Sequence, residues 1–237
     1  MLNNINKTLC ALAVLAATTL PALAESIDVK VIGTIDPTAC TPTLSGGGTI
    51  DYGMIKPNTL NKDAFTTLAV KQLDFAITCD APAKVAITAT SQRGVSAVSS
   101  DGTLTSLGMY PGLFGITGNA MTFGLGLDGA KGIGGYSMRI AAGTVMADSQ
   151  SVDSIQSNGD AAHWTTTPYG MLITGTGVGA GVIRYSSWAT PGTTVPVAFT
   201  NLTGKLEVQA YINKTSELDL TKPVTLDGLA TLELVYL

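Results

Sequence analysis

LAVKQLDFAITC, residues 68–79, carries the pattern of a β-strand in its second half. Every second residue from Leu73 through Phe75 and Ile77 to Cys79 is apolar, and this period of two is typical of a strand with one buried face. The sequence DAP at 80–82 predicts a turn, and KVAITAT at 84–90 predicts a strand that returns beside the first. We therefore expect an antiparallel sheet that starts from this pair.

Short segments of the same kind recur along the chain. Thr and Val are plentiful, 27 of the 237 residues are Gly, and no stretch after residue 24 keeps the apolar spacing of a helix. Many short strands at such intervals describe an all-β sandwich rather than an α/β enzyme. We expect further strands at residues 27–35, 49–55, 121–127, 136–142, 169–174, 182–188, 194–200, 205–213 and 230–237, and an exposed polar loop at residues 148–162.

Residues 1–24 have the features of a secretory signal peptide. Lys7 precedes an apolar run, and Ala22 and Ala24 match the small residues at which signal peptidase cuts. We expect the mature chain to begin at Glu25, with an N-terminal extension at residues 25–36 and a single domain at residues 37–237.

Composition narrows the possible partners. The chain is acidic, with a formal net charge of −4, and it has no basic cluster that could neutralise phosphates. After the signal peptide, no apolar run approaches the roughly 18 residues that a membrane-spanning helix needs. We therefore expect an exported protein with no nucleic-acid partner and no membrane span.

Cys40 and Cys79 are the cysteines that remain once the signal peptide is removed with Cys10. In an oxidising export compartment, two thiols without clustered histidines predict a disulfide rather than a metal site or a nucleophile. Closing the loop between them stabilises the fold by roughly 4 kcal/mol in the chain-entropy account.

The motifs of enzymes are weak or absent. Residues 124–129 (GLGLDG) match the dinucleotide pattern GxGxxG, but the glycines at 132, 134 and 135 would destroy the helix that this chemistry requires, so the pattern predicts a turn. His163 is the only histidine, and no GxSxG segment is present. We expect no catalytic, metal-binding or cofactor-binding residues, and therefore no enzyme.

Aromatic residues gather at Trp164, Tyr169 and Trp188. Exposed aromatic rings can stack on sugars, although core or loop-anchoring aromatics are commoner. Glycan contact at these three residues is an alternative that we keep.

Both ends of the mature chain show a strand pattern. Ile27, Val29 and Val31 alternate with polar residues near the start, and Leu232, Leu234 and Tyr236 lie on one face of a strand that ends one residue before the chain does. The mature chain has, in this order, the alternating N-terminal segment, Gly33, Cys40, residues 51–55 (DYGMI), residues 73–80 (LDFAITCD) and a penultimate tyrosine. In the order of these segments it resembles the pilins of chaperone-usher fimbriae, in particular their fimbrial-like periplasmic group.

This resemblance implies an incomplete immunoglobulin-like β-sandwich that is completed by a donor strand. A periplasmic chaperone and then the neighbouring subunit at an outer-membrane usher would each lend a strand. The donor residues would be Ile27, Val29, Val31 and Gly33. Leu232, Leu234 and Tyr236 would lie on the groove strand with which the chaperone and then the donor pair.

Three functions follow from the sequence. The first is a structural, non-enzymatic subunit that polymerises by donor-strand complementation into a cell-surface fimbrium and supports adhesion. The second is a carbohydrate- or receptor-binding fimbrial subunit that contacts a host ligand through the loops of residues 91–188. The third is a free periplasmic β-sandwich protein, including a β-sandwich enzyme. The sequence gives the least support to this third function.

Overall fold

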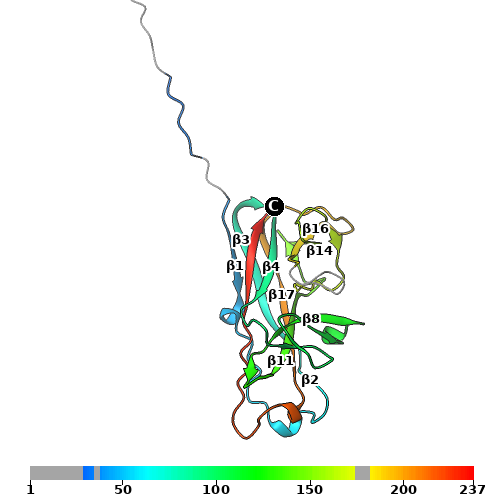
Figure 1. Ribbon diagram of the computed structural model, residues 1–237. Coiled ribbons are helices and arrows are strands. Elements are labelled where there is room, and N and C mark those ends of the chain that lie inside the picture. Colours follow the sequence, from blue (N-terminus) through cyan, green and yellow to red (C-terminus); the bar gives the residue numbers. More distant parts are fainter. Residues whose placement is uncertain (1–28, 35–37, 174–181) are drawn as a thin grey trace, which may run out of the picture. The chain divides into compact units, whose positions relative to one another are not determined.

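The computed structural model describes residues 29–34, 38–173 and 182–237 of the chain (Figure 1). It divides into two units, residues 1–36 and residues 37–237, which we describe separately. In the first unit, Val29, Val31 and Ile32 are exposed by 85%, 91% and 79%. The expected donor residue Ile27 lies outside the described residues.

The second unit is all-β. Its described residues contain helix only as four single 3-10 turns, η1 (Ser45–Gly48), η2 (Pro57–Thr59), η3 (Leu113–Gly115) and η4 (Thr215–Glu217). The strands are β1 (Cys40–Leu44), β2 (Thr66–Thr67), β3 (Lys71–Ala83), β4 (Val85–Ser91), β5 (Ala97–Val98), β6 (Leu104–Thr105), β7 (Gly108–Pro111), β8 (Asn119–Gly124), β9 (Leu127–Asp128), β10 (Lys131–Gly132), β11 (Gly134–Ile140), β12 (Met146–Ala147), β13 (Gln150–Ser151), β14 (Asp153–Asn158), β15 (Thr165–Thr166), β16 (Arg184–Ala189), β17 (Phe199–Ile212) and β18 (Ala230–Tyr236).

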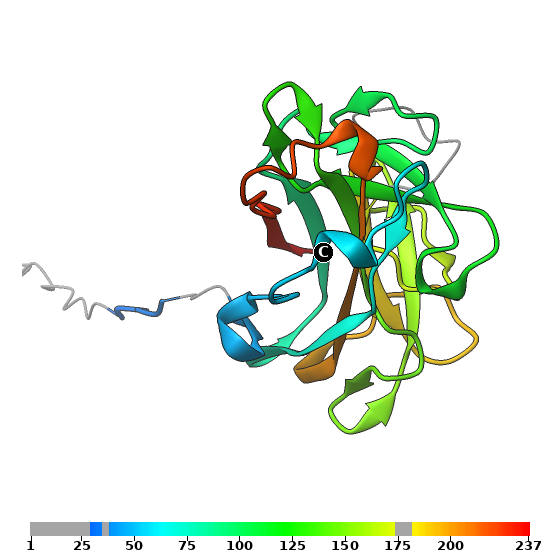
Figure 2. The ribbon, with the colours of Figure 1, turned by 90° about the horizontal axis from the view of Figure 1, so that it is seen from below.

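Two open sheets make up the body of this unit (Figures 1 and 2). The larger sheet has the central order β1-β3-β17-β11-β5-β6, with short strands attached along it. The smaller sheet has the order β15-β14-β16-β4-β18. β1 and β18 are therefore edge strands of different sheets, and both views show them on the same side of the body.

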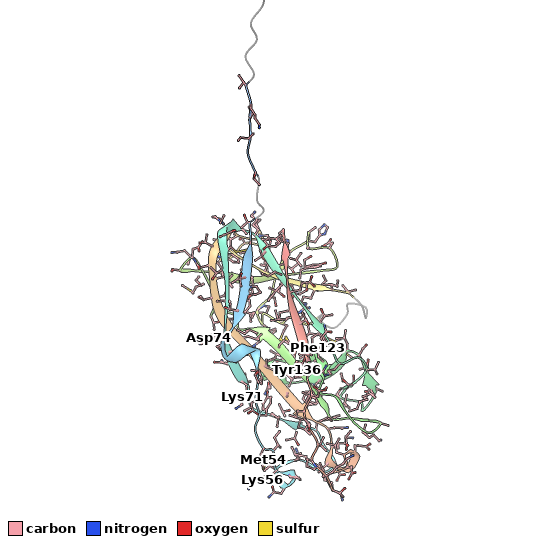
Figure 3. All side chains as sticks on the ribbon, turned by 90° about the vertical axis from the view of Figure 1, so that its left-hand side faces the viewer. Met54, Lys56, Lys71, Asp74, Phe123 and Tyr136 are labelled. Carbon is pink, nitrogen blue, oxygen red and sulfur yellow. A yellow bond between two sulfur atoms is a disulfide. The ribbon has the colours of Figure 1, made fainter. Side chains whose placement is uncertain are left out.

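The alternating pattern of β3 produces the buried face that it predicts. Phe75, Ile77 and Cys79 are nearly inaccessible, and β3 pairs with β17 in an antiparallel ladder that includes Ile77 opposite Leu202. On the next strand pair, Tyr136 of β11 packs edge-on against Phe123 of β8, with ring centroids 6.1 Å apart (Figure 3). β11 is buried at six of its seven residues, so this central strand is covered on both faces.

A cluster of aromatic residues joins the two sheets. The Trp188 ring of β16 lies 6.2 Å from the Phe75 ring of β3 and 6.1 Å from the Phe199 ring of β17. Because these residues belong to opposite sheets and each is at most 2% exposed, the sheets share one core. This arrangement is consistent with a β-sandwich.

Several strand predictions are correct in place and wrong in extent. β4, β8, β11, β16, β17 and β18 overlap the expected segments. The GxGxxG segment was predicted as a turn; it forms no helix, but it contains β9, which pairs with β10 in a short hairpin. The expected turn at residues 80–82 is instead part of β3, which runs on to Ala83. The strand predictions for residues 49–55 and 169–174 are wrong in the part that the structure describes, which leaves out residue 174. Met171 makes only an isolated bridge with Arg139, and residues 49–55 pair with neither sheet.

The prediction of an exposed loop at residues 148–162 is wrong. Its centre is β14, which pairs with β16 over six residues and buries Ile155 completely. The polar composition is misleading here because Ser154 and Ser157 are buried although serine is mostly an exposed residue. The Ser157 hydroxyl donates to Asp160 Oδ1 at 2.9 Å.

No helix in the described residues is long and apolar enough to cross a membrane.

Candidate strand-binding groove

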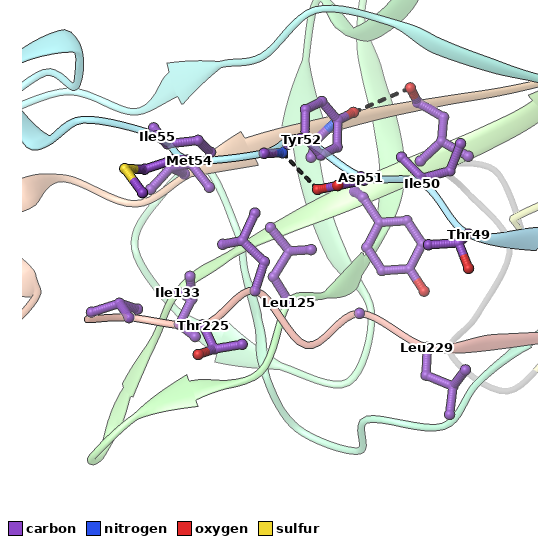
Figure 4. Close-up of a pocket in the computed structure, with 18 of the residues that line it drawn as sticks. Thr49, Ile50, Asp51, Tyr52, Met54, Ile55, Leu125, Ile133, Thr225 and Leu229 are labelled. Carbon is purple, nitrogen blue, oxygen red and sulfur yellow. Dashed lines mark hydrogen bonds between the residues drawn. The ribbon is translucent and has the colours of Figure 1, made fainter.

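A groove of about 920 Å³ opens on the side of the second unit where β1 and β18 lie. Its floor is the inner face of the larger sheet, and two irregular segments form its walls: the first wall (residues 47–57) and the second wall (residues 218–229). Figure 4 shows Ile50 and Tyr52 on one side, Thr225 and Leu229 on the other, and Leu125 and Ile133 between them.

The floor is apolar because every second residue of two paired strands faces it. Tyr136 and Met138 of β11 stand opposite Ala210 and Val208 of β17 in the antiparallel ladder. All four line the groove, as do Leu206 and Ile212, which continue the alternation of β17. Burial raises the pKa of Tyr136, so its phenol is neutral.

Tyr52 attaches the first wall to the floor. Its hydroxyl donates to the carbonyl of Val208 at 3.3 Å and accepts from the N–H of Ala210 at 3.1 Å. These backbone groups lie where β17 passes from pairing with β3 to pairing with β2, so the phenol supplies the partner that neither strand provides. Burial raises the pKa of Tyr52, while the Ala210 N–H opposes that shift.

The outer part of the first wall, around Met54, is more exposed than the part at Tyr52. Gly53 has a φ of 65°, and its N–H donates to Asp51 Oδ1 at 2.6 Å, which turns the chain back on itself. Met54 follows and is 91% exposed; Figure 3 shows it with Lys56 at the lower end of the molecule.

The second wall is held from outside by polar contacts. Arg93 reaches Asp227 twice, through Nη2 to Oδ1 at 2.6 Å and through Nε to the carbonyl oxygen at 2.9 Å. Asp128 accepts from the N–H of Asp219 at 2.7 Å and pairs with Lys222 at 3.2 Å. The hydrogen bond to Asp128 is the largest cause of the raised pKa of Lys222.

The second wall presents its apolar side chains to the groove. Leu218, Leu220, Val224 and Leu226 line it. Gly228 lies so close to the floor that a Cβ there would approach Tyr136 Cε1 to 2.8 Å, so only glycine fits without a shift. The wall therefore combines a polar outer surface with an apolar inner one.

The groove also borders on free strand edges. Within the described residues β18 pairs only with β4, and β1 pairs only with β3. Leu44 of β1 and Leu232 of β18 line the groove where these strands reach it. An extended segment placed in the groove would meet unpaired backbone groups of β18 as well as an apolar floor.

The predicted disulfide between Cys40 and Cys79 is confirmed. It joins β1 to β3 where the two residues stand opposite each other in the ladder. The bridge therefore fixes the register of an edge strand that borders the groove.

The other predicted site residues belong to both units. Leu232 lines the groove, whereas Leu234 and Tyr236 continue β18 beyond it. Gly33 and the donor residues Val29 and Val31 belong to the first unit. Sequence reasoning missed the second wall, although Leu218, Leu220, Val224 and Leu226 follow a period of two, interrupted by Lys222, that could have indicated it.

The glycan-contact hypothesis loses one of its three residues. Trp188 is 1% exposed within the shared core, so its ring cannot stack on a sugar at the surface, and this part of the hypothesis is wrong. Tyr169 is exposed and Trp164 is half-buried. In the part of the chain that the structure describes, no three His, Cys, Asp or Glu side chains are grouped as a metal would require.

Comparison with known proteins gives relatives over the whole length. The family described as "Protein of unknown function (DUF1120)" matches residues 29–137. "Uncharacterized protein YhcF" of Escherichia coli (strain K12) is 29% identical over 100% of both chains. "Protein GltF" of the same organism is 31% identical, over 96% of this chain and 94% of its own. No solved structure gives a significant match.

Proposed function

Because this chain belongs to the DUF1120 family, whose description specifies no activity, we propose a function from the groove: a structural subunit that polymerises by donor-strand complementation in a chaperone-usher fimbria. The observation that carries the proposal is the apolar groove of about 920 Å³ beside the free edge of β18. On this account the protein is not an enzyme.

The groove has the properties of an acceptor site for a strand. Its floor is apolar but nearly buried at Leu125, Ile133 and Met138. Met54 and Leu229 leave exposed apolar surface at its walls, and an edge strand with unpaired N–H and C=O groups runs into it. Exposed apolar surface and an open edge favour association with another extended segment. Strand addition satisfies both needs at once, because the backbone pairs with the edge and alternate side chains fill the groove.

The occupant that we propose is the N-terminal segment of a second copy. Val29 and Val31 alternate with Lys30, are almost fully exposed, and belong to a unit separate from the β body. Two apolar side chains on one face of an extended segment are what an apolar groove beside a free edge accepts. Ile27 and Gly33 extend the proposed donor segment on either side.

The resemblance to pilins supplies the remaining partners. A periplasmic chaperone would fill the groove before assembly, and an outer-membrane usher would exchange its strand for that of the neighbouring subunit. The proposed location is accordingly the cell surface, reached through the periplasm, which agrees with the predicted signal peptide and an oxidised Cys40–Cys79 pair. Adhesion to a host glycan or receptor stays a second prediction, with Trp164 and Tyr169 as its remaining aromatic residues.

The test compares two adjacent apolar residues in the full chain, exported beside a fimbrial chaperone. Val31→Asp places a charge on the donor face, and Ile32→Asp makes the same chemical change on the opposite face. We expect heat-stable multimers from the wild type and from Ile32→Asp. We expect Val31→Asp to give only chaperone-bound or monomeric protein.

Two results would count against the proposal. Multimers that survive Val31→Asp as well as Ile32→Asp would show that this stripe is not the donor. A wild-type chain that folds without a chaperone as a stable monomer at all concentrations would favour the free periplasmic protein instead.

A further inference from the structure

A hydrogen bond joins the edge strands of the two sheets. The backbone N–H of Cys40 in β1 donates to the hydroxyl of Tyr236 in β18 at 2.7 Å, between residues 196 positions apart. β1 and β18 are not paired through their backbones in the described residues, so this contact connects two free edges.

The N–H of Cys40 is one that an added strand would use. Ala39 accepts from the N–H of Asp80, so the hydrogen-bonded pairs of the β1–β3 ladder fall at residue 39 and at every second residue after it. Cys40 and Cys79 are then a non-hydrogen-bonded pair, in agreement with their Cα separation of 4.0 Å. The N–H of Cys40 therefore points away from β3, to the free edge, where the Tyr236 hydroxyl takes the place of an acceptor from an incoming strand.

Pro42 removes the next donor from that edge. By the same alternation residue 42 also faces away from β3, and proline has no N–H. Between Cys40 and Thr43, β1 thus has no edge N–H that is free. Leu44 is the first residue that can offer one, and it is also the residue of β1 that lines the groove.

The groove ends at the same level on β18. The N–H of Leu237 donates to Lys84 and that of Gln92 donates to Leu229, so the odd-numbered residues of this strand form the backbone hydrogen bonds with β4. The backbone groups of residues 230, 232, 234 and 236 therefore face the free edge. Ala230 and Leu232 line the groove, but Leu234 and Tyr236 do not.

We propose that Tyr236 is a specificity-determining residue that closes this end of the groove and limits the length of strand the subunit accepts. This inference rests on the proposed function. The accepted strand pairs with β18 at Ala230 and Leu232 and stops before Leu234, because going further requires breaking the Tyr236–Cys40 hydrogen bond. The limit suits the short donor segment of this chain, in which only eight residues, 25–32, precede Gly33.

The experiment uses the mature chain carrying Val31→Asp, purified as its complex with the chaperone, and measures how tightly added peptides bind as they displace the chaperone. The Val31→Asp change prevents the chain's own segment from competing. One peptide has the sequence of residues 25–33, and two longer peptides add Val-Thr-Val-Thr at the first or at the last residue. With Tyr236 present, we expect the longer peptides to bind no more tightly than the short one. In Tyr236→Phe we expect one longer peptide to bind roughly 2- to 10-fold more tightly, the factor that corresponds to one hydrogen bond, while the short peptide is unchanged.

A second readout and a matched control accompany it. The Cys40 amide should exchange with deuterium faster in Tyr236→Phe than in the parent protein. Tyr169→Phe removes an exposed hydroxyl elsewhere and should change neither binding nor exchange at Cys40.

The outcomes separate the two proposals. If the short peptide binds but Tyr236→Phe gives no gain for either longer peptide, or leaves Cys40 exchange unchanged, the role of Tyr236 is wrong and the proposed function stands. If no peptide binds to either protein, the proposed function and the role of Tyr236 are both wrong.

Discussion

Arg93 and Asp227 are joined at two points, by a 2.6 Å contact between Nη2 and the carboxylate and by a 2.9 Å hydrogen bond from Nε to the Asp227 carbonyl. The pair attaches the second wall to the loop that follows β4. Because the N–H of Asp227 also donates to Leu125 at 2.9 Å, both faces of the wall are anchored at one residue. The position of this wall, and so the width of the groove, depends on that residue.

Arg93→Ala should loosen the second wall while keeping the fold. The pair is partly solvent-exposed, so we expect a loss of about 1 kcal/mol or less in the free energy of unfolding. Amide hydrogen exchange in residues 225–229 should nevertheless accelerate. The control is Lys205→Ala, which breaks the Lys205–Asp74 pair elsewhere on the larger sheet, and equal acceleration in both variants would contradict the role of Arg93.

Tyr52→Phe should cost more than its small change in volume suggests. Removing the hydroxyl leaves the Val208 carbonyl and the Ala210 N–H without that partner in a half-buried position, which costs about 1 to 3 kcal/mol. Urea unfolding of the mature chain measures the difference. Tyr169→Phe, at an exposed ring, should change the free energy of unfolding by less than about 0.5 kcal/mol, and equal effects would argue against the proposed anchor.

Replacing both Cys40 and Cys79 by Ser should lower the free energy of unfolding by about 4 kcal/mol, since the bridge closes a separation of 39 residues. Reducing the wild type with dithiothreitol should give the same loss in a urea titration. A reduced wild type as stable as the oxidised protein would show that the bridge does not constrain the unfolded chain.

Trp188→Ala should destabilise strongly, because a ring buried between Phe75 and Phe199 leaves a cavity in the shared core. We expect a loss of about 3 to 5 kcal/mol in thermal or urea unfolding. Trp164→Ala, at a half-buried ring, serves as the control and should lose distinctly less. A reversed order would mean that the core is assigned wrongly.

Asp148 should stabilise the fold at neutral pH, and this contribution should be lost in acid. The Thr200 hydroxyl donates to its carboxylate at 2.7 Å and, with the N–H groups of Asn201 and Thr200, lowers the pKa of Asp148 below its ordinary value of 3.8. A lowered pKa means that the stabilising contribution is present above the unfolded pKa and is lost as pH falls through the folded one.

Unfolding at pH 7 and near pH 3 tests this dependence. The free energy of unfolding of Asp148→Asn should lie further below that of the wild type at pH 7 than near pH 3. Thr200→Val removes the hydroxyl that is the largest cause of the lowered pKa of Asp148, so it should weaken the pH dependence while keeping the carboxylate. Asn also tolerates the positive φ of 46° at this position. A wild-type-to-Asn difference that is constant with pH would contradict the assignment.

Local patterns predicted the sheets where burial follows a period of two. β3 and β18 are recognisable because one face of each is apolar and the other polar, and β4 is rich in the β-branched residues Val, Ile and Thr. β14 was missed because its buried side chains are mostly small and hydroxylic, so burial leaves no contrast in the sequence. β1 was missed because CTPTL has Pro at its centre, which is tolerated only because residue 42 faces a free edge.

The sequence by itself determined the all-β class, the Cys40–Cys79 bridge and the position of the alternating segments at both ends of the mature chain, because each depends on residue type and spacing along a short stretch. Only the tertiary structure decided that Trp188 belongs to the core, that residues 47–57 and 218–229 form the walls of one groove, and that Tyr236 meets Cys40. These features depend on contacts between residues as far as 196 positions apart, and no local period encodes which distant edge a side chain will reach.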